Sequence, residues 1–228
     1  MPKHPRRTMR STRQPRPLED FLDVLGPLAL GVLGLACVAG GLSPSATSPP
    51  QPRYLGIPRD VFDFVAAAQE QDMWCWAASI QMLLNYYGIS IHQRDIVSRV
   101  FGFPANEPGT DAEINASLNG WGVQTSGRRF VVRSSIVNGV PQPSVLYQEL
   151  SSRRPVLLAF NPGCSVGHAV VVTGVSLLNG VITSLIYRDP WPTQQNVANK
   201  GRVELFTDDL AAFLPSVRAH WLVAVQQV

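Results

Sequence analysis

The sequence of 228 residues predicts an α+β fold in which a helical N-terminal half packs against a C-terminal antiparallel sheet. Apolar residues recur at helical spacing after residue 70, whereas from residue 155 onward short segments rich in Val, Ile, Leu and Phe alternate with Gly, Asn or Pro. Hydrophobic residues make up 45% of the chain and charged residues 15%, a balance that supports a packed core and excludes a wholly disordered chain.

The helical half contains four predicted helices. In the first, from Trp74 to Tyr87, apolar side chains follow a period of 3.6, and Gly88 ends it. Two further helices are predicted from capping boxes, in which a Ser or Thr precedes a Glu or Gln by three positions. Ser90 with Gln93 predicts a helix to about Phe101. The other capping box predicts a helix from Thr110, with Glu113, to about Gly120, and a fourth helix is predicted over 143–152.

The second half has the composition of strands. Five segments are rich in β-branched and large apolar residues: 155–160, 168–176, 181–188, 202–206 and 220–227. The sequence Leu178-Asn179-Gly180 predicts a tight hairpin turn between the second and third of them. These strands therefore form an antiparallel sheet that follows the helices along the chain.

The basic residues of the chain are concentrated at its start. Residues 1–23 hold six of the 19 Lys and Arg residues and three of the 16 Asp and Glu residues, which is the whole net charge of +3. The remainder has 13 residues of each sign. A balanced domain lacks the positive surface that phosphate backbones require, so we expect no nucleic-acid partner.

An export signal is predicted before the folded domain. The basic stretch is followed by residues 24–42, which are apolar or glycine apart from Pro27, and then by a Pro/Ser-rich linker over 43–53. This order is typical of a secretory signal peptide, and the apolar run is also long enough for an uncleaved membrane anchor. We expect residues 1–42 to be one of these and residues 54–228 to form an extracytoplasmic domain, secreted, periplasmic or anchored facing outward.

The cysteine pattern leaves two interpretations open. Cys37 lies in the leader, and Cys75 and Cys164 remain in an oxidising compartment, where a pair often forms a disulfide. No CxxC or HExxH motif occurs, so we expect neither a metal site nor a cofactor.

Cys75 stands at the first turn of the strongest predicted helix. A helix N-terminus carries partial positive charge, which favours a thiolate, the attacking form of a cysteine nucleophile. The alternative is a buried structural cysteine between Trp74 and Trp76.

His168 and Asp189 are the candidate partners of this cysteine. His168 opens one predicted strand and Asp189 ends the next, so pairing through the turn at Asn179-Gly180 brings them to the same end of a hairpin. There a carboxylate can fix the tautomer of an imidazole that serves as base and then acid. His92 and His220 lack such a context, and we expect both to be structural.

Gln69 precedes Cys75 by six residues. Its side-chain amide can donate to a developing oxyanion beside the Cys75 backbone N–H, although the spacing leaves Gln71 as a competitor.

Together these segments resemble the papain-like cysteine peptidases. The resemblance rests on Gln69, five residues and then Cys75-Trp-Ala, on Gly-His168-Ala before a strand, and on Asp189-Pro-Trp, where that family has Asn-Ser-Trp. The chain departs from the family at Asp72 and Met73, which stand where the family has a cysteine and a small residue. One family disulfide is therefore missing.

The chain is also similar to the double-glycine leader peptidases, the bacteriocin-processing domains of exporters. This similarity includes Leu-Leu-Asn-Tyr-Tyr-Gly over 83–88, the helix start at Gly109-Thr110 and the final Asp-Pro. Those domains face the cytoplasm, whereas this one carries an export signal. The resemblance, from about Gln69 to residue 192, implies a papain-like fold in which Cys75 is the nucleophile, His168 the general base and then acid, Asp189 the orienting group and Gln69 the oxyanion donor.

The expected function is hydrolysis of peptide bonds in a peptide or protein substrate through an acyl-enzyme. A thiol acyltransferase or deamidase uses the same constellation of residues. A different class of function, an inactive exported binding domain, would follow from a disulfide between Cys75 and Cys164.

Overall fold

The computed structural model describes residues 50–120, 127–163 and 166–228. The helices are α1 (Arg59–Asp63), α2 (Cys75–Tyr86), α3 (Gln93–Phe101), α4 (Asp111–Leu118), α5 (Pro143–Ser151), α6 (Gln194–Ala198) and α7 (Thr207–Phe213). The strands are β1 (Arg53–Gly56), β2 (Phe130–Asn138), β3 (Val156–Phe160), β4 (His168–Leu178), β5 (Val181–Arg188), β6 (Arg202–Phe206) and β7 (Val217–Gln227). Among these residues, none of the helices combines the length and the apolar character needed to cross a membrane.

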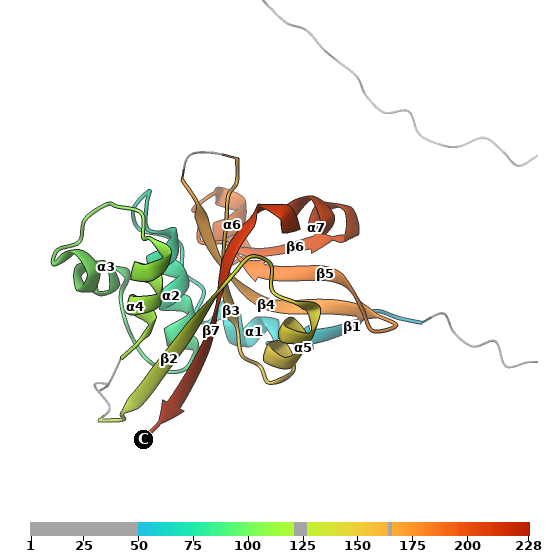
Figure 1. The fold of residues 1–228 in the computed structure, drawn as a ribbon, viewed down its shortest axis with the longest axis horizontal. Coiled ribbons are helices and arrows are strands. Elements are labelled where there is room, and N and C mark those ends of the chain that lie inside the picture. Colours follow the sequence, from blue (N-terminus) through green and yellow to red (C-terminus); the bar gives the residue numbers. More distant parts are fainter. Residues whose placement is uncertain (1–49, 121–126, 164–165) are drawn as a thin grey trace, which may run out of the picture. The chain divides into compact units, whose positions relative to one another are not determined.

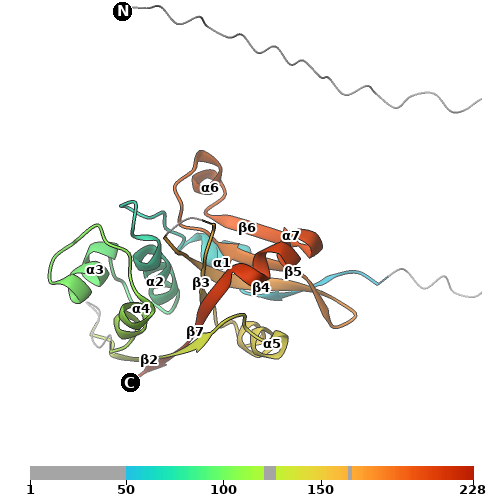
Figure 2. The same ribbon diagram turned by 45° about the horizontal axis from the view of Figure 1, so that its top comes forward.

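Six strands of the antiparallel sheet follow the order β2-β7-β3-β4-β5-β6, and the seventh, β1, pairs with β4 (Figures 1 and 2). The long strand β4 lies at its centre. Its first half pairs with β3 and its second half with β1, while β5 runs along its other edge. The start of β4, where His168 lies, is thereby held between neighbouring strands.

The core lies on both faces of this sheet. On one face α2, α3 and α4 pack against Leu157, Ala159 and the matching side of β7. On the other face α5 and α7 pack against Val156 and Leu158. Successive residues of β3 therefore face opposite clusters, which is the period of two that a strand buried on both sides requires. Figure 1 shows α2, α3 and α4 grouped on one side of the strands.

The α+β prediction is confirmed, and so are the four predicted helices and five predicted strands. The helix predicted over 74–87 is α2, and the hairpin turn is the one predicted, with φ angles of 52° at Asn179 and 82° at Gly180. The structure adds elements to the predicted order of helices first and sheet afterwards. β1 precedes α2, β2 lies between α4 and α5, and the short helices α6 and α7 lie among the C-terminal strands.

These two strands escaped prediction for different reasons. β1 has only four residues and is defined by its pairing with β4, which no local pattern reveals. β2 is an edge strand, in which Phe130 and Val132 are buried but most of the following residues are exposed. The sequence patterns of β1 and β2 are therefore weaker than those of the central strands.

One of the two predicted capping boxes is also wrong. Thr110 and Glu113 form the expected reciprocal box at the start of α4. Ser90, however, does not cap α3, which begins at Gln93 after His92. The Gln93 side chain is buried instead, and its Nε2 donates to the Ala68 carbonyl at 2.8 Å and to Gln81 Oε1 at 2.9 Å.

Candidate active site

Cys75 is the first residue of α2, and its buried side chain is 8% exposed. The flanking tryptophans fix this helix start. Trp74 Nε1 donates to the Ala105 carbonyl at 2.7 Å, and Trp76 Nε1 donates to the Glu107 carbonyl at 3.2 Å. Because the first N–H groups of a helix lack intrahelical acceptors, the turn at Cys75 presents donors and partial positive charge beside the thiol.

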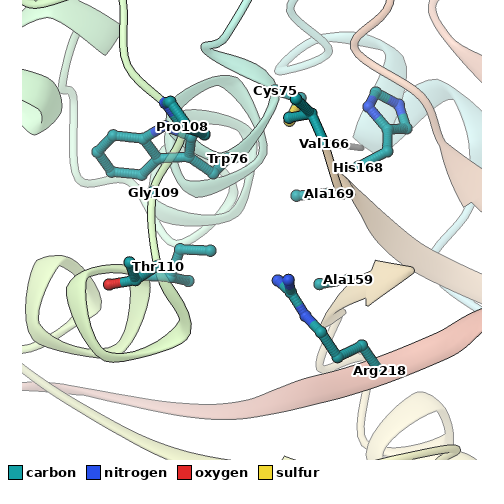
Figure 3. A pocket seen from close by; sticks show the side chains of 12 residues that line it. Cys75, Trp76, Pro108, Gly109, Thr110, Ala159, Val166, His168, Ala169 and Arg218 are labelled. Atoms are coloured by element: carbon teal, nitrogen blue, oxygen red, sulfur yellow. The ribbon is translucent and has the colours of Figure 1, made fainter. Parts of the chain in front are cut away.

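A close approach of the backbone reinforces this arrangement. A Cβ atom at Gly109 would lie only 2.7 Å from the Trp76 ring, so glycine is needed for the backbone to approach the indole this closely. Figure 3 shows Trp76 against Gly109 on one side of the cavity.

His168 is the first residue of β4, opposite Phe160 of β3. A buried hydrogen bond ties this strand to the catalytic helix: Ser79 Oγ of α2 donates to the Ala169 carbonyl at 3.0 Å. With α2 and the start of β4 joined in this way, Cys75 and His168 are close enough for the cysteine to raise the pKa of the histidine. The two residues border the same cavity (Figure 3).

Asp189 follows β5 and lies beside His168, as the hairpin predicted. Its Oδ1 is 2.7 Å from His168 Nε2 and also accepts the backbone N–H of Trp191 at 2.8 Å. The Asp189 N–H donates to the Gly201 carbonyl at 2.7 Å. A Cβ at Gly201, whose φ is 68°, would lie 2.4 Å from the Asp189 carbonyl oxygen, so only glycine leaves room for this turn.

The surroundings of His168 keep its imidazole protonated. Burial lowers its pKa, but the hydrogen bonds to Asp189 and Cys75 and the charges of both groups outweigh burial and raise the pKa to about 9. Two rings enclose the imidazole edge-on: Phe160 with its centroid at 5.5 Å and Trp191 at 6.4 Å. Because an aspartate oxygen only accepts, Nε2 carries the proton directed at Asp189 and Nδ1 remains for the thiol.

Gln69 is buried close to the chain segments that carry Cys75 and Asp189. Its Nε2 donates to the carbonyls of Gln71 at 2.9 Å and Asp72 at 2.8 Å, and its backbone N–H donates to the Pro190 carbonyl at 2.8 Å. To donate to an oxyanion, the amide must release one of these two carbonyls. The competitor Gln71 is exposed at the surface. Gln69 as oxyanion donor stays a prediction.

Two positioning residues were missed by the sequence reasoning. Ser79 joins α2 to β4, but a serine inside a buried helix face gives no signal of its partner on a distant strand. Gln93 fixes the backbone next to Gln69, because its Oε1 accepts the N–H of Glu70 at 2.9 Å. Its position three residues after Ser90 suggested a helix cap. Its contact with residue 70 could not be predicted, because the two residues lie far apart in the sequence.

Two cavities meet at Cys75 and His168. One, of about 240 Å³, extends toward Trp76, Gly109 and Arg218. The other, of about 680 Å³, extends past Met73 and Phe160 to Trp191. The cysteine and histidine are thus accessible to an extended chain from either side. Within the described ranges, no group of three or more His, Cys, Asp or Glu side chains is placed to hold a metal ion.

Several predictions concern residues outside the described ranges. They include the leader over 1–42, most of the linker over 43–53, and Cys164, the predicted disulfide partner of Cys75. Cys75 itself is a free cysteine in the structure. His92 and His220 lie apart from the site: His92 is the residue before α3, and His220 is buried with Nδ1 2.9 Å from the Gly139 carbonyl oxygen.

Comparison with known proteins gives one family and several solved structures. The profile of the Peptidase_C39 like family matches residues 61–208. The double glycine motif protease of an AMS/PCAT transporter, solved with its leader peptide, is 15% identical, with 69% of this chain and 89% of that chain aligned and a TM-score of 0.46. The peptidase domain of the Streptococcus transporter ComA is 16% identical over 69% and 96%, with a TM-score of 0.48.

A third solved structure, the proform of the ragweed pollen cysteine protease Amb a 11, is 11% identical over 77% of this chain and 60% of its own, with a TM-score of 0.45. No curated protein sequence matches the chain.

Proposed function

The chain belongs to the Peptidase_C39 like family and is a cysteine peptidase, and from this premise we propose that Cys75, His168 and Asp189 are the residues that cleave its substrate. The substrate is a peptide or protein, and the proposed reaction is hydrolysis of a peptide bond through an acyl-enzyme. The observation that carries the assignment is that Cys75 and His168 border the same two cavities while His168 Nε2 lies 2.7 Å from Asp189 Oδ1.

The geometry supports each step of this reaction. The Cys75 thiolate attacks the substrate carbonyl carbon, and the resulting oxyanion lies near the N–H groups at the start of α2, with Gln69 as the proposed second donor. The His168 imidazolium gives its proton to the leaving amine, and the C–N bond breaks to leave a thioester on Cys75. Neutral His168 then takes a proton from water, which attacks the thioester; the C–S bond breaks, and this releases the acid and regenerates the Cys75 thiolate beside the His168 imidazolium.

Asp189 and Trp191 support His168 during both proton transfers. The carboxylate holds the Nε2–H and stabilises the imidazolium, so Nδ1 stays directed at the thiol and the leaving group. Trp191 packs edge-on against the imidazole, and its backbone N–H in turn holds the carboxylate. Exclusion of water strengthens the attraction between the Asp189 carboxylate and the His168 imidazolium.

The leader gives the proposed location of this activity. Residues 24–42 follow a basic stretch and suit either a signal peptide or an anchor. We propose that the peptidase domain acts outside the cytoplasm, on peptides that meet it there.

The direct test is cleavage of a peptide library by the full chain, with products identified by mass spectrometry. We expect cleavage by the wild-type chain and a loss of more than about 10³-fold in Cys75→Ala, since nothing replaces the nucleophile. In H₂¹⁸O, hydrolysis places one heavy oxygen in the new carboxylate. Equal cleavage by wild type and Cys75→Ala would refute the assignment, and products without ¹⁸O but joined to an added amine would show acyl transfer instead.

A further inference from the structure

The lining of the smaller cavity beside Cys75 combines apolar side chains with polar groups, among them Thr110, His168 and one further charged group. Its walls are formed mainly by small or apolar side chains and by glycine: Trp76, Gly109, Ile114, Ala159, Gly167 and Ala169. Arg218 supplies the additional charge. A guanidinium in such a cavity, next to the nucleophile, is placed to contact bound substrate.

A β-bulge places Arg218 in the cavity. β3 and β7 pair Ala159 with Ala219 but Phe160 with Val217, so Arg218 is the extra residue. The packing agrees, because Val217 joins one core cluster and Ala219 the other, although residues two apart in a regular strand share a face. Bulges redirect side chains and are enriched next to active sites.

The guanidinium lies beside Gly167, the residue before His168. A Cβ at Gly167 would come within 3.3 Å of Arg218 Nη1, so glycine leaves the space that the guanidinium occupies. Figure 3 shows the guanidinium of Arg218 rising from β7 toward Ala159 and Ala169, inside the cavity.

One donor of this guanidinium is already engaged. Arg218 Nη2 donates to Asp111 Oδ1 of α4 at 2.6 Å, and the two side chains remain 40% and 31% exposed. Arg218 lines the cavity, whereas Asp111 does not. Since a guanidinium has five N–H donors in a planar fork, Arg218 keeps donors for the cavity besides the one that binds Asp111.

We propose that Arg218 makes this cavity a subsite for a substrate side chain that ends in a carboxylate, so that the peptidase prefers glutamate near the scissile bond. The apolar walls suit the methylene groups of glutamate, and the guanidinium accepts its carboxylate in a charge-assisted, bidentate geometry. This inference rests on the proposed function, because it concerns substrate bound at Cys75.

A purely structural role for the pair makes a different prediction. If the ion pair only joins α4 to β7, Asp111→Asn and Arg218→Glu both reduce stability and leave substrate preference unchanged. If Arg218 binds substrate, Asp111→Asn releases its guanidinium and increases the preference for a carboxylate. Asp111→Asn and Arg218→Glu therefore change the preference for a carboxylate side chain in opposite directions only if Arg218 binds substrate.

The experiment compares cleavage of paired peptide libraries by the full chain, with Glu or Gln at each position within three residues of the bond. We expect one position at which Glu peptides are cut about tenfold faster than their Gln partners. Arg218→Glu should abolish this preference and favour Lys at the same position, while Arg218→Lys should keep part of it. Arg133→Glu, the same charge change on an exposed residue of β2, is the matched control and should keep it fully.

The outcomes separate the two proposals. Cleavage that depends on Cys75 but treats Glu and Gln alike at every position would overturn this inference and leave the proposed function standing. No cleavage by the wild-type chain, or equal cleavage by Cys75→Ala, would overturn both. If Arg218→Glu does not fold, Asp111→Asn decides: a preference for Glu that does not increase would contradict the proposal.

Discussion

At the scale of single residues, His168 is the group whose surroundings are most completely specified. Asp189 accepts from one nitrogen, Cys75 pairs with the ring, and Phe160 and Trp191 cover its edges. Burial alone would lower its pKa, and the two anionic partners reverse this effect. An imidazolium that persists to about pH 9 can stabilise a neighbouring thiolate and donate a proton to the leaving amine.

Substitution of Asp189 separates its charge from its hydrogen bonds. In Asp189→Asn the side-chain oxygen can still accept from His168 Nε2 and the Trp191 N–H, but the negative charge that raises the pKa of His168 is gone. We expect a smaller loss of kcat/KM than for Cys75→Ala. In the profile of kcat/KM against pH, we expect the fall on the alkaline side to occur below about pH 9.

Asp189→Ala serves as the comparison, because it removes both charge and hydrogen bonds and should lose about 10²–10⁴-fold. The measurement is kcat/KM between pH 5 and 10 for the three chains. An alkaline limb at the same pH in Asp189→Asn and wild type would show that the carboxylate does not set the protonation of His168.

The principal site residues could be predicted from sequence because each lies at the end of a strongly patterned element. Cys75 begins a long apolar helix, and His168 and Asp189 flank a hairpin with an Asn-Gly turn. Gln93 and Arg218 could not be found in this way. Their partners lie 25 residues away at Ala68 and 107 residues away at Asp111, and those contacts exist only in the folded domain.

At the scale of elements, the site depends on how α2 meets β4. The bond from Ser79 to the Ala169 carbonyl lies one turn after Cys75 and one residue after His168. It therefore fixes the distance between nucleophile and base as well as joining the two halves.

Ser79→Ala should loosen this junction. Loss of a buried hydrogen bond, with the carbonyl left unpaired, costs about 1–3 kcal/mol of unfolding free energy. Because the hydroxyl also positions β4, we expect kcat/KM to fall more than stability alone would explain. Urea unfolding and peptide cleavage provide the two measurements.

Ser151→Ala is the matched control, since its hydroxyl donates to the Gln148 carbonyl at an exposed position of helix α5. It should leave stability and activity within experimental error. Equal behaviour of the two variants would show that the contact between α2 and β4 does not depend on Ser79.

The element types were predictable wherever burial enforces a clear period. The central strands β3, β4 and β5 are buried and rich in branched residues, and α2 is buried along most of its length. β1 and β2 lie at sheet edges or are very short, and the helices α1, α6 and α7 have at most seven residues. Such elements depend on tertiary contacts more than on local pattern.

At the scale of the whole molecule, the sequence places a basic stretch and an apolar run, the predicted leader, before a domain whose charges balance. The helical half contributes Cys75, the proposed nucleophile, and the sheet contributes His168 and Asp189, the proposed base and orienting carboxylate. The site exists only where these halves meet, so catalysis and the packing between the halves are inseparable. The β7 bulge adds a charged residue to the same junction, which links substrate recognition to the fold.

The central claim, that His168 activates Cys75, is tested most directly by alkylation of the reduced full chain with iodoacetamide as a function of pH. Mass spectrometry maps the labelled site, and Cys37 and Cys164 serve as internal references. We predict that Cys75 reacts nearly as fast at pH 6 as at pH 8, and that His168→Ala removes this reactivity and leaves a rise near the free-thiol value of about 8.5. Identical profiles for Cys75 in the wild-type and His168→Ala chains, both rising only near that pH, would contradict the account.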